Sequence, residues 1–205
     1  MQYDPSLVCR KEDALYELLI LALLMRDTMH GYLIAKIMND MIGPETKVSH
    51  GSLYPKLKAL EQEGCITTSE VKDEASQHDR QARDYSISEE GRRRFHKLMM
   101  DMTAHPGEYS KFFWLKVCFF DFLHPVERLE LVDHYIHYCQ MHTHHLKAET
   151  RNVVDGKAYY RSLSLPQLEL TLHTLRRAAS HWQVEMEYAT ILREKEMAKA
   201  LVDGV

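Results

Sequence analysis

Residues 48–64 decide the fold and read VSHGSLYPKLKALEQEG. Apolar residues recur in this stretch at the spacing of one helical face, namely Leu53, Leu57 and Leu60. Ser49 precedes them as an N-cap residue, and Gly64 follows as a C-terminal stop. Pro55 removes one interior hydrogen bond, but the carbonyl that its ring crowds belongs to Gly51. We therefore predict one helix between Ser49 and Gly64.

The charges along this helix are unevenly distributed. Lysines occupy positions 47, 56 and 58, and no acid occurs between Lys47 and Leu60. The first acids are Glu61 and Glu63, at the end of the helix. A helix with this polarity is suited to presenting its N-terminal half to phosphate groups.

The segments on either side predict the rest of an N-terminal domain. Upstream, apolar periodicity predicts helices over 13–26, with Asp13 as N-cap, and over 29–42, which Gly43 and Pro44 end. Downstream, two β-type stretches, 65–71 and 82–87, flank a polar loop and predict a hairpin. Ser88, followed by Glu89 and Glu90, predicts the start of a fourth helix. Three helices, a hairpin and a helix are the order of a winged helix-turn-helix.

The C-terminal half is expected to be helical. Residues 112–123 are apolar on all sides, as in a helix buried between domains or subunits. Pro125 is expected to open a helix that ends near Val154, and a last helix is expected over 166–201. Its apolar residues alternate steps of four and three, which is the seam of a helix pair. The seam residues, expected at a dimer interface, are Leu168, Leu172, Leu175, Ala179, Trp182 and Met186.

The expected fold class is therefore mainly α with a small β-wing. We predict a winged helix-turn-helix domain over 1–102, a linker over 103–110, and a helical dimerisation domain over 111–205.

Composition restricts the functional classes. The chain has 205 residues, of which 45% are hydrophobic and 27% charged, so a packed core is expected. No apolar run approaches the length of a membrane span, and the N-terminus lacks a signal-peptide pattern, so we expect a cytoplasmic protein. The four cysteines are scattered without a metal-binding spacing. No phosphate loop or nucleophile motif occurs, so we do not expect an enzyme or a cofactor.

Three motifs resemble the PadR family of bacterial regulators. They are His30–Gly31–Tyr32, the stretch 48–55 with its continuation to Gly64, and the stretch 85–91 at the end of the wing. Together they extend over residues 13–100 in the order that the family shows. The C-terminal half is similar to the long branch of the family, which includes phenolic-acid-responsive repressors and a virulence-gene activator. Thr103–Ala104–His105–Pro106, Phe113, Leu115, Lys116 and Trp182 carry this second likeness.

The resemblance implies a homodimer that binds double-stranded DNA with two half-sites. The helix after Ser49 would lie in the major groove, and the wing would reach the backbone. One departure is the number of acids in and near the wing loop, at Asp73, Glu74, Asp79 and Asp84. The residues expected to contact DNA are Lys47, Ser49, His50, Gly51, Ser52, Tyr54, Lys56, Lys58, Arg80 and Arg83.

Two further sites stay open. Phe112, Phe113 and Trp114 are suited to lining a pocket for a small aromatic effector, with Lys116 or Arg128 pairing its carboxylate. An interface core is nevertheless the expectation for these aromatic residues. Five histidines crowd the helix after Pro125, at positions 134, 137, 142, 144 and 145. Histidines at these spacings can bind zinc or nickel, but packing or solvated histidines are the expectation, so no metal site is predicted.

The sequence thus predicts a sequence-specific, homodimeric regulator of transcription, a repressor controlled by a small aromatic ligand. The alternative is a winged-helix adaptor that binds proteins and not DNA, because a fold does not fix a function. The net charge of −4 and the acidic wing favour the adaptor; the lysines near Tyr54 and Pro55 favour DNA binding.

Overall fold

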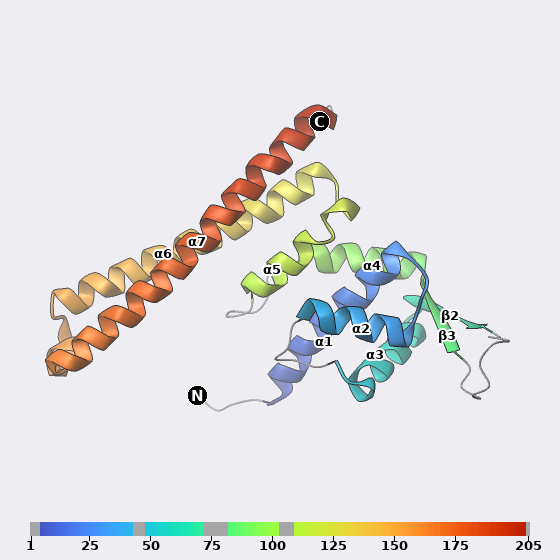
Figure 1. The fold of residues 1–205 in the computed structure, drawn as a ribbon, viewed down its shortest axis with the longest axis horizontal. Coiled ribbons are helices and arrows are strands. Elements are labelled where there is room, and N and C mark those ends of the chain that lie inside the picture. Colours follow the sequence, from blue (N-terminus) through green and yellow to red (C-terminus); the bar gives the residue numbers. More distant parts are fainter. Residues whose placement is uncertain (1–4, 43–47, 72–81, 103–108, 204–205) are drawn as a thin grey trace. The chain divides into compact units, whose positions relative to one another are not determined.

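The structure is a computed structural model that describes residues 5–42, 48–71, 82–102 and 109–203. The chain divides into two compact units, Met1–Phe119 and Phe120–Val205 (Figure 1). The first unit extends past the linker predicted over 103–110 and includes residues 111–119, which the sequence assigned to the C-terminal domain. Most of these residues belong to one helix, Tyr109–Val117, in which Phe112, Phe113, Leu115 and Lys116 are buried. Residues 103–108 of the predicted linker lie outside the described part of the chain.

The first unit has the predicted order of elements, with two additions. Helices α1 (Pro5–Arg26), α2 (Gly31–Ile42), α3 (His50–Gln62) and α4 (Glu89–Met100) combine with strands β2 (Ile66–Val71) and β3 (Ala82–Ile87). The additions are a two-residue strand, β1 (Met29–His30), and helix α5 (Tyr109–Val117). The fold is mainly helical with a small β-wing, as predicted.

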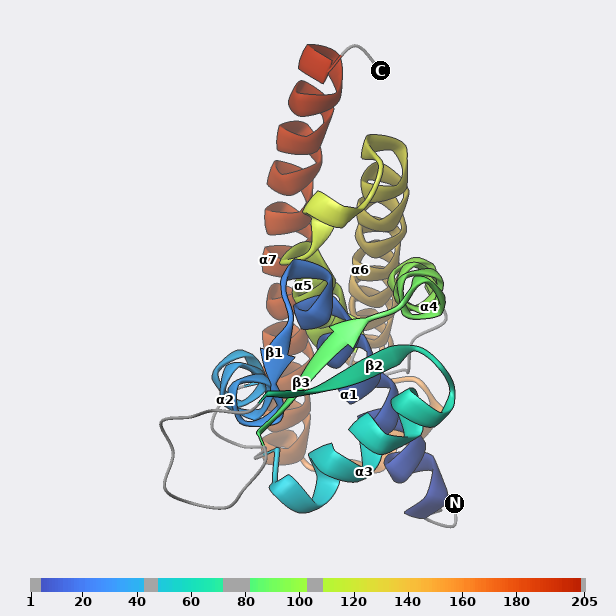
Figure 2. The same cartoon turned by 90° about the vertical axis from the view of Figure 1, so that its right-hand side faces the viewer.

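The wing sheet has three strands in the order β1-β3-β2, all antiparallel (Figure 2). Met29 is paired with Tyr85, and Ile66 is paired with Ile87. The sequence predicted that Met29 opens a helix. Its backbone instead pairs with β3, and the helix begins at Gly31. The predicted start of the first helix at Asp13 is also wrong, because α1 begins at Pro5, in a position where proline is favoured.

The centre of the core is α1, whose residues from Leu18 to Leu24 are almost completely buried. Ile34 and Met38 of α2 and Leu53, Leu57 and Leu60 of α3 share this core with no more than 1% of their surface exposed. Tyr32, in the first turn of α2, is 69% exposed. The stripe of α2 runs through Ile34, Ala35, Met38 and Ile42, and Tyr32 lies outside it.

Gly91 allows α4 to pack closely against the start of the wing. A Cβ at this position would lie 2.0 Å from the carbonyl oxygen of Cys65. The same carbonyl accepts hydrogen bonds from the Ser88 backbone at 3.0 Å and the Ser88 hydroxyl at 2.9 Å. Ser88 also caps α4 as predicted, since its hydroxyl oxygen accepts the Gly91 N–H at 3.0 Å. The close approach that Gly91 permits therefore brings the start of α4 within hydrogen-bonding distance of Cys65, the residue before β2.

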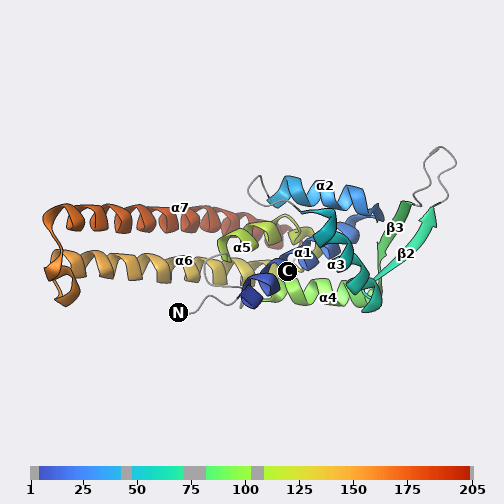
Figure 3. The ribbon, with the colours of Figure 1, turned by 90° about the horizontal axis from the view of Figure 1, so that it is seen from below.

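The second unit is a helical hairpin. Helices α6 (Pro125–Val154) and α7 (Leu165–Asp203) run side by side along their length (Figure 3). Short 3-10 segments at Phe120–Phe122 and Ala158–Ser162 precede α6 and connect it to α7. Gly156, at φ 60°, ends the turn after α6, where the sequence placed a break. The apolar stretch 112–123 is thus two elements, α5 and a 3-10 turn, and not one helix.

The apolar seam predicted along the last helix contacts α6 of the same chain at its centre. Trp182 packs edge-on against Tyr138, with ring centroids 5.4 Å apart, and stacks on His142 at 4.4 Å. The six seam residues are all half-buried. None of the helices in the described ranges combines the length and the apolarity needed to cross a membrane.

We expect Gly91→Ala to reduce the free energy of unfolding by about 3 kcal/mol, because the added methyl group overlaps a backbone carbonyl that cannot move independently. Gly51→Ala is the matched control, since its Cβ would only meet the Ser49 hydroxyl at 3.6 Å. Ala is a better helix former than Gly, so the control should be neutral or stabilising. Urea unfolding followed by circular dichroism measures both; equal stabilities would contradict the prediction.

Candidate nucleic-acid interface

The N-terminus of α3 is fixed by a reciprocal cap. The Ser49 hydroxyl accepts the backbone N–H of Ser52 at 3.1 Å, and the Ser52 hydroxyl accepts the N–H of Ser49 at 3.1 Å. Two backbone donors that a helix start leaves without partners are therefore satisfied by two small side chains. The predicted N-cap is confirmed, and the serine at the third helical position takes the place that Glu or Gln usually has in this motif.

Asn39 of α2 positions the backbone that leads into this cap. Its side-chain oxygen accepts the N–H of Val48 at 2.7 Å. Its amide nitrogen donates to the carbonyl oxygens of Ala35, at 2.9 Å, and Val48, at 3.3 Å. Val48 itself is buried. One asparagine therefore links the body of α2 to the residue that precedes the Ser49 cap.

Beneath α3, the buried Glu17 of α1 contacts two cations. Its carboxylate accepts a hydrogen bond from Nε of Arg94 on α4 at 2.5 Å and lies 3.3 Å from Nζ of Lys56 on α3. The side chain of Glu17 is 8% exposed, against 19% for Lys56 and 40% for Arg94. The hydrogen bond that Arg94 donates to Glu17 raises the pKa of Arg94, so this guanidinium stays charged. This ionic cluster joins three helices.

The outward face of α3 carries the remaining predicted residues. Gly51, Ser52, Tyr54 and Lys58 are exposed, and so is Ser49 just before them. His50 is the first residue of the helix. Tyr54 is 42% exposed, but its ring also packs on α2, since a Cβ on Gly31 would lie 3.0 Å from the ring. The hydroxyl-rich N-terminal half of α3 is thus a solvent-facing surface on a rigid base.

Lys56 differs from the other predicted contacts. Its ammonium group is directed toward Glu17, in the interior, whereas Lys58 is exposed. Lys58 is therefore the lysine of α3 that is available to an external anion. Lys47 and Arg80, also predicted contacts, lie outside the described residues.

The wing contributes one described cation, Arg83, which is exposed on β3. Next to it, Asp84 forms an ion pair with His30 of β1. Asp84 was one of the acids that counted against a wing near phosphate, and its charge is partnered whenever His30 is protonated. On β2, the Thr68 hydroxyl donates to Glu61 of α3 at 2.6 Å, which ties the sheet to the end of that helix.

The run Arg92–Arg94 on α4 points in three directions, as consecutive helical residues must. Arg94 contacts Glu17, Arg93 pairs with Glu90 at 2.6 Å, and Arg92 approaches the sulfur of Met25 at 3.5 Å. All three side chains therefore have partners inside the first unit.

The residues suggested for an aromatic pocket are largely core. Phe112 and Phe113 are 5% and 1% exposed, and the rings of Phe113 and Trp114 meet edge-on at 5.1 Å. Lys116 is 3% exposed, and its ammonium group donates to the carbonyl oxygen of Asp101 at 2.7 Å. Burial lowers the pKa of Lys116 from 10.5 to about 8. Lys116 therefore loses its proton at a lower pH than a lysine in water does.

The histidines of α6 are dispersed. His142 lies between aromatic rings, 4.4 Å from Tyr138 and 4.4 Å from Trp182, and burial lowers its pKa. His137, His144 and His145 are exposed. Among the residues that the structure describes, no group of three His, Cys, Asp or Glu side chains is arranged to hold a metal ion.

Two important residues escaped the sequence prediction. Glu17 had a signal, since it is an acid inside the apolar run between Ala14 and Leu24. An acid in such a position implies a buried partner, although not which one. No signal in the sequence pointed to Asn39, because a polar residue near the end of a helix is common.

We expect Arg94→Met to lower the free energy of unfolding by about 2 kcal/mol or more, because the buried Glu17 carboxylate loses its closest partner. Arg93→Met, at the next residue, removes an exposed ion pair and should change stability by less than about 0.5 kcal/mol. Glu17→Met combined with Arg94→Met should recover part of the loss, since the buried carboxylate is gone and only Lys56, with 19% of its side chain exposed, loses a partner. Chemical unfolding of the parent chain, the two single variants and the double variant measures these free energies. Equal losses in the two single variants would refute the role of Glu17.

Lys116 predicts a pH dependence of stability. Its folded pKa lies below the unfolded value, so the folded chain releases its proton first as the pH rises. Between about pH 8 and 10.5 the unfolded state binds more protons, and stability therefore rises with pH through this residue, by at most about 3 kcal/mol. Lys116→Met removes this titrating group. The difference in free energy of unfolding by which the variant exceeds the parent chain should therefore shrink as the pH rises from about 8 to 10.5. Lys111→Met, exposed on the same helix, should show a constant difference.

Comparison with known proteins agrees with this arrangement. Residues 20–97 match the model of the transcriptional regulator PadR-like family. No curated protein sequence matches the chain. Among solved structures, Bacillus subtilis PadR in complex with operator DNA is 20% identical, with 88% of this chain and 98% of that chain covered and a TM-score of 0.40.

Two other solved structures cover most of both chains. The PadR-like regulator BC1756 from Bacillus cereus is 20% identical, covering 90% of this chain and 99% of its own, with a TM-score of 0.35. The Vibrio cholerae virulence activator AphA is 22% identical, with the same coverages and a TM-score of 0.35. The family model matches residues 20–97, a range that spans the end of α1, α2, α3, the wing strands and most of α4. The chain therefore contains, over residues 20–97, a winged-helix domain that matches the transcriptional regulator PadR-like family.

Proposed function

We propose that this protein is a sequence-specific DNA-binding repressor that acts in the cytoplasm as a homodimer. The observation that carries the proposal is the N-terminal half of α3: it is capped, exposed, rich in hydroxyl groups, and supported from the interior by Asn39 and Glu17. A helix of this kind enters the major groove with its N-terminal residues at the base edges.

Each residue of this surface has a role that its chemistry suits. Ser49 and Ser52 would bind base edges or phosphates with the hydrogen-bonding capacity that the cap leaves to their hydroxyls, His50 would add an imidazole, and Gly51 allows the backbone to come close. Tyr54 offers its hydroxyl, and Lys58 its charge, to the phosphate backbone. From the wing, Arg83 and Arg80 would contact a neighbouring phosphate. Lys47 would add charge just before the helix, whereas Lys56 would act mainly through Glu17.

The homodimer would form through the second unit. The exposed side chains of Val184, Tyr188 and Ile191 follow one face of α7, at spacings of four and three residues. Together with the half-buried seam from Leu168 to Met186, they offer apolar surface to a second copy. Two copies of α3 would then read half-sites about 34 Å apart, or a multiple of that distance.

A small aromatic effector is the proposed control. Its ring would lie against Phe112, Phe113 and Trp114, and its carboxylate near Lys116. Because Phe112, Phe113 and Lys116 are buried, binding requires α5 to move, and this movement supplies a difference between two states that a ligand can exploit.

Fluorescence anisotropy tests the function directly. Purified protein is titrated into labelled DNA from upstream of its own gene, at several salt concentrations, against scrambled DNA, and with and without phenolic acids. Preferential, salt-sensitive binding supports the regulator, and its loss with a phenolic acid supports the effector. Failure to prefer any fragment, extended to fragments of the whole genome, would favour the protein-binding adaptor instead.

We expect Lys58→Gln to weaken binding to all DNA sequences and to reduce the slope of log K against log salt by about 1 per subunit, since one phosphate contact is lost. Lys97→Gln is the control: it makes the same charge change at an exposed lysine of α4, outside the proposed surface. Equal slopes for the two variants, measured by anisotropy, would remove Lys58 from the interface.

A further inference from the structure

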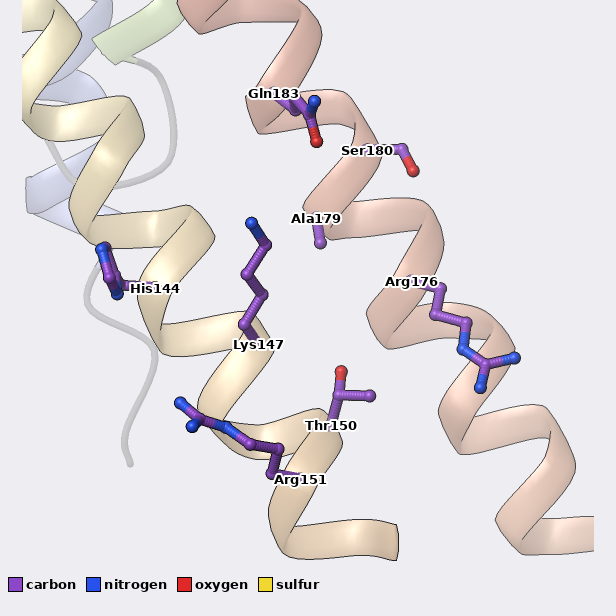
Figure 4. A pocket seen from close by; sticks show the side chains of 8 residues that line it. All are labelled: His144, Lys147, Thr150, Arg151, Arg176, Ala179, Ser180 and Gln183. Atoms are coloured by element: carbon purple, nitrogen blue, oxygen red, sulfur yellow. The ribbon is translucent and has the colours of Figure 1, made fainter.

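The second unit contains a basic groove between α6 and α7 (Figure 4). Its volume is about 730 Å³, within the range of small-molecule sites. Both helices contribute to its lining: His144, Lys147, Thr150 and Arg151 from α6, and Arg176, Ala179, Ser180 and Gln183 from α7. We call this surface the α6–α7 groove.

Three permanent positive charges line the groove, and no acid does. Within the described part of the chain, the side chains of Lys147, Arg151 and Arg176 form no ion pair or hydrogen bond. The neighbouring Glu149 is already engaged, since it accepts bonds from Asn152 at 3.0 Å and Tyr160 at 2.9 Å. The groove therefore gathers positive charge that the protein does not compensate.

Elsewhere in the same unit, three cations pair with acids. Arg128 pairs with the buried Glu196 at 2.9 Å, and Lys199 pairs with the same carboxylate at 2.5 Å. Arg193 pairs with Asp133 at 2.5 Å. The absence of acids from the groove is thus a local property, and not a consequence of a basic composition, because the whole chain has a net charge of −4.

The side chains are arranged for a ligand that spans both helices. Lys147 and Thr150 extend from α6 into the space between the helices, and the small Ala179 faces them from α7 (Figure 4). Arg151 and Arg176 flank this space on opposite sides (Figure 4). Both arginines are exposed, so their side chains can rotate toward a ligand within nanoseconds. Ser180 adds a hydroxyl donor, whereas the hydroxyl of Thr150 already donates to the carbonyl oxygen of Leu146 at 2.8 Å.

We propose that the α6–α7 groove binds a small polyanion of the phosphate-ester class, such as a nucleotide. A phosphate group presents several acceptor oxygens, which match the forked guanidinium groups of Arg151 and Arg176 and the point charge of Lys147. Double-stranded DNA is too wide for a groove bounded by two adjacent helices of one hairpin. The site lies wholly within the second unit and is separate from the proposed DNA surface, so its occupancy does not depend on DNA binding.

Isothermal titration calorimetry of the full-length chain at low salt, without DNA or divalent cations, tests the proposal. The probes are ATP, inorganic pyrophosphate, citrate, adenosine and benzoate. We expect ATP and pyrophosphate to bind with dissociation constants of about 100 μM or below, with weakening as salt rises. Adenosine and benzoate, which lack multiple charges, should not bind, and citrate binding as tight as that of ATP would overturn the phosphate assignment.

Matched variants locate the site. Lys147→Gln with Arg176→Gln should weaken ATP binding at least tenfold. Arg177→Gln with Lys195→Gln makes the same charge change on α7 outside the groove, and should keep the affinity within about twofold. Circular dichroism should show that both variants fold.

Three results would overturn the proposal: no heat of binding with 1 mM ATP or pyrophosphate, equal weakening in both double variants, or loss of subunit association in the groove variant together with absent nucleotide binding. The last result would make the groove a contact between copies of the chain. None of these depends on DNA, so a failure here is distinguishable from a failure of the proposed repressor.

Discussion

The position of α3 depends on the Glu17 carboxylate, which is buried beneath that helix and shared by Arg94 and Lys56. Removing a carboxylate from water costs several kcal/mol, and contact with two cations offsets this cost only when the geometry is good. An apolar residue would pack there without a penalty and without a preferred direction. The ionic cluster instead specifies one arrangement of α1, α3 and α4. Its contribution is therefore to the uniqueness of the helix position more than to overall stability.

Polar contacts outside the core also fix the position of α3. Asn39 fixes the approach of the chain to Ser49, and the Tyr54 ring packs against Gly31, so α2 limits α3 from the outer side while Glu17 limits it from within. Lys56 shows the consequence for function, because one of the two central lysines of α3 is used to hold the helix and the other, Lys58, remains exposed. A recognition surface that is fixed before binding loses less conformational entropy when it binds.

Local patterns predicted the elements, whereas contacts between distant residues decided what the patterns missed. The Ser49 and Ser88 caps, the Gly64 stop and Pro125 at the start of α6 act within a few residues, and the sequence located all of them. Strand β1 depends on pairing with β3, more than fifty residues away, and therefore looked like the start of α2. Likewise, no local rule tells that Gly91 faces the Cys65 carbonyl or that Lys56 meets Glu17. The candidate surface on α3 was predictable as a stretch, but not its division into inward and outward charges.

The second unit shows a related division of charge along one hairpin. Near the start of α6 and the end of α7, Arg128, Arg193 and Lys199 pair with acids. At the centre, Tyr138, His142 and Trp182 form an aromatic layer, and the Tyr135 hydroxyl donates to Glu185 at 2.5 Å. Burial raises the pKa of the neighbouring Cys139 to about 11 and lowers that of His142, so neither adds a charge near neutral pH. On the other side of this neutral layer lies the basic groove, whose cations have no acid partner among the described residues. Because the aromatic contacts and the ion pairs on its other side already hold α6 and α7 together, the helices do not need compensating acids in the groove, and its cations are left for a ligand.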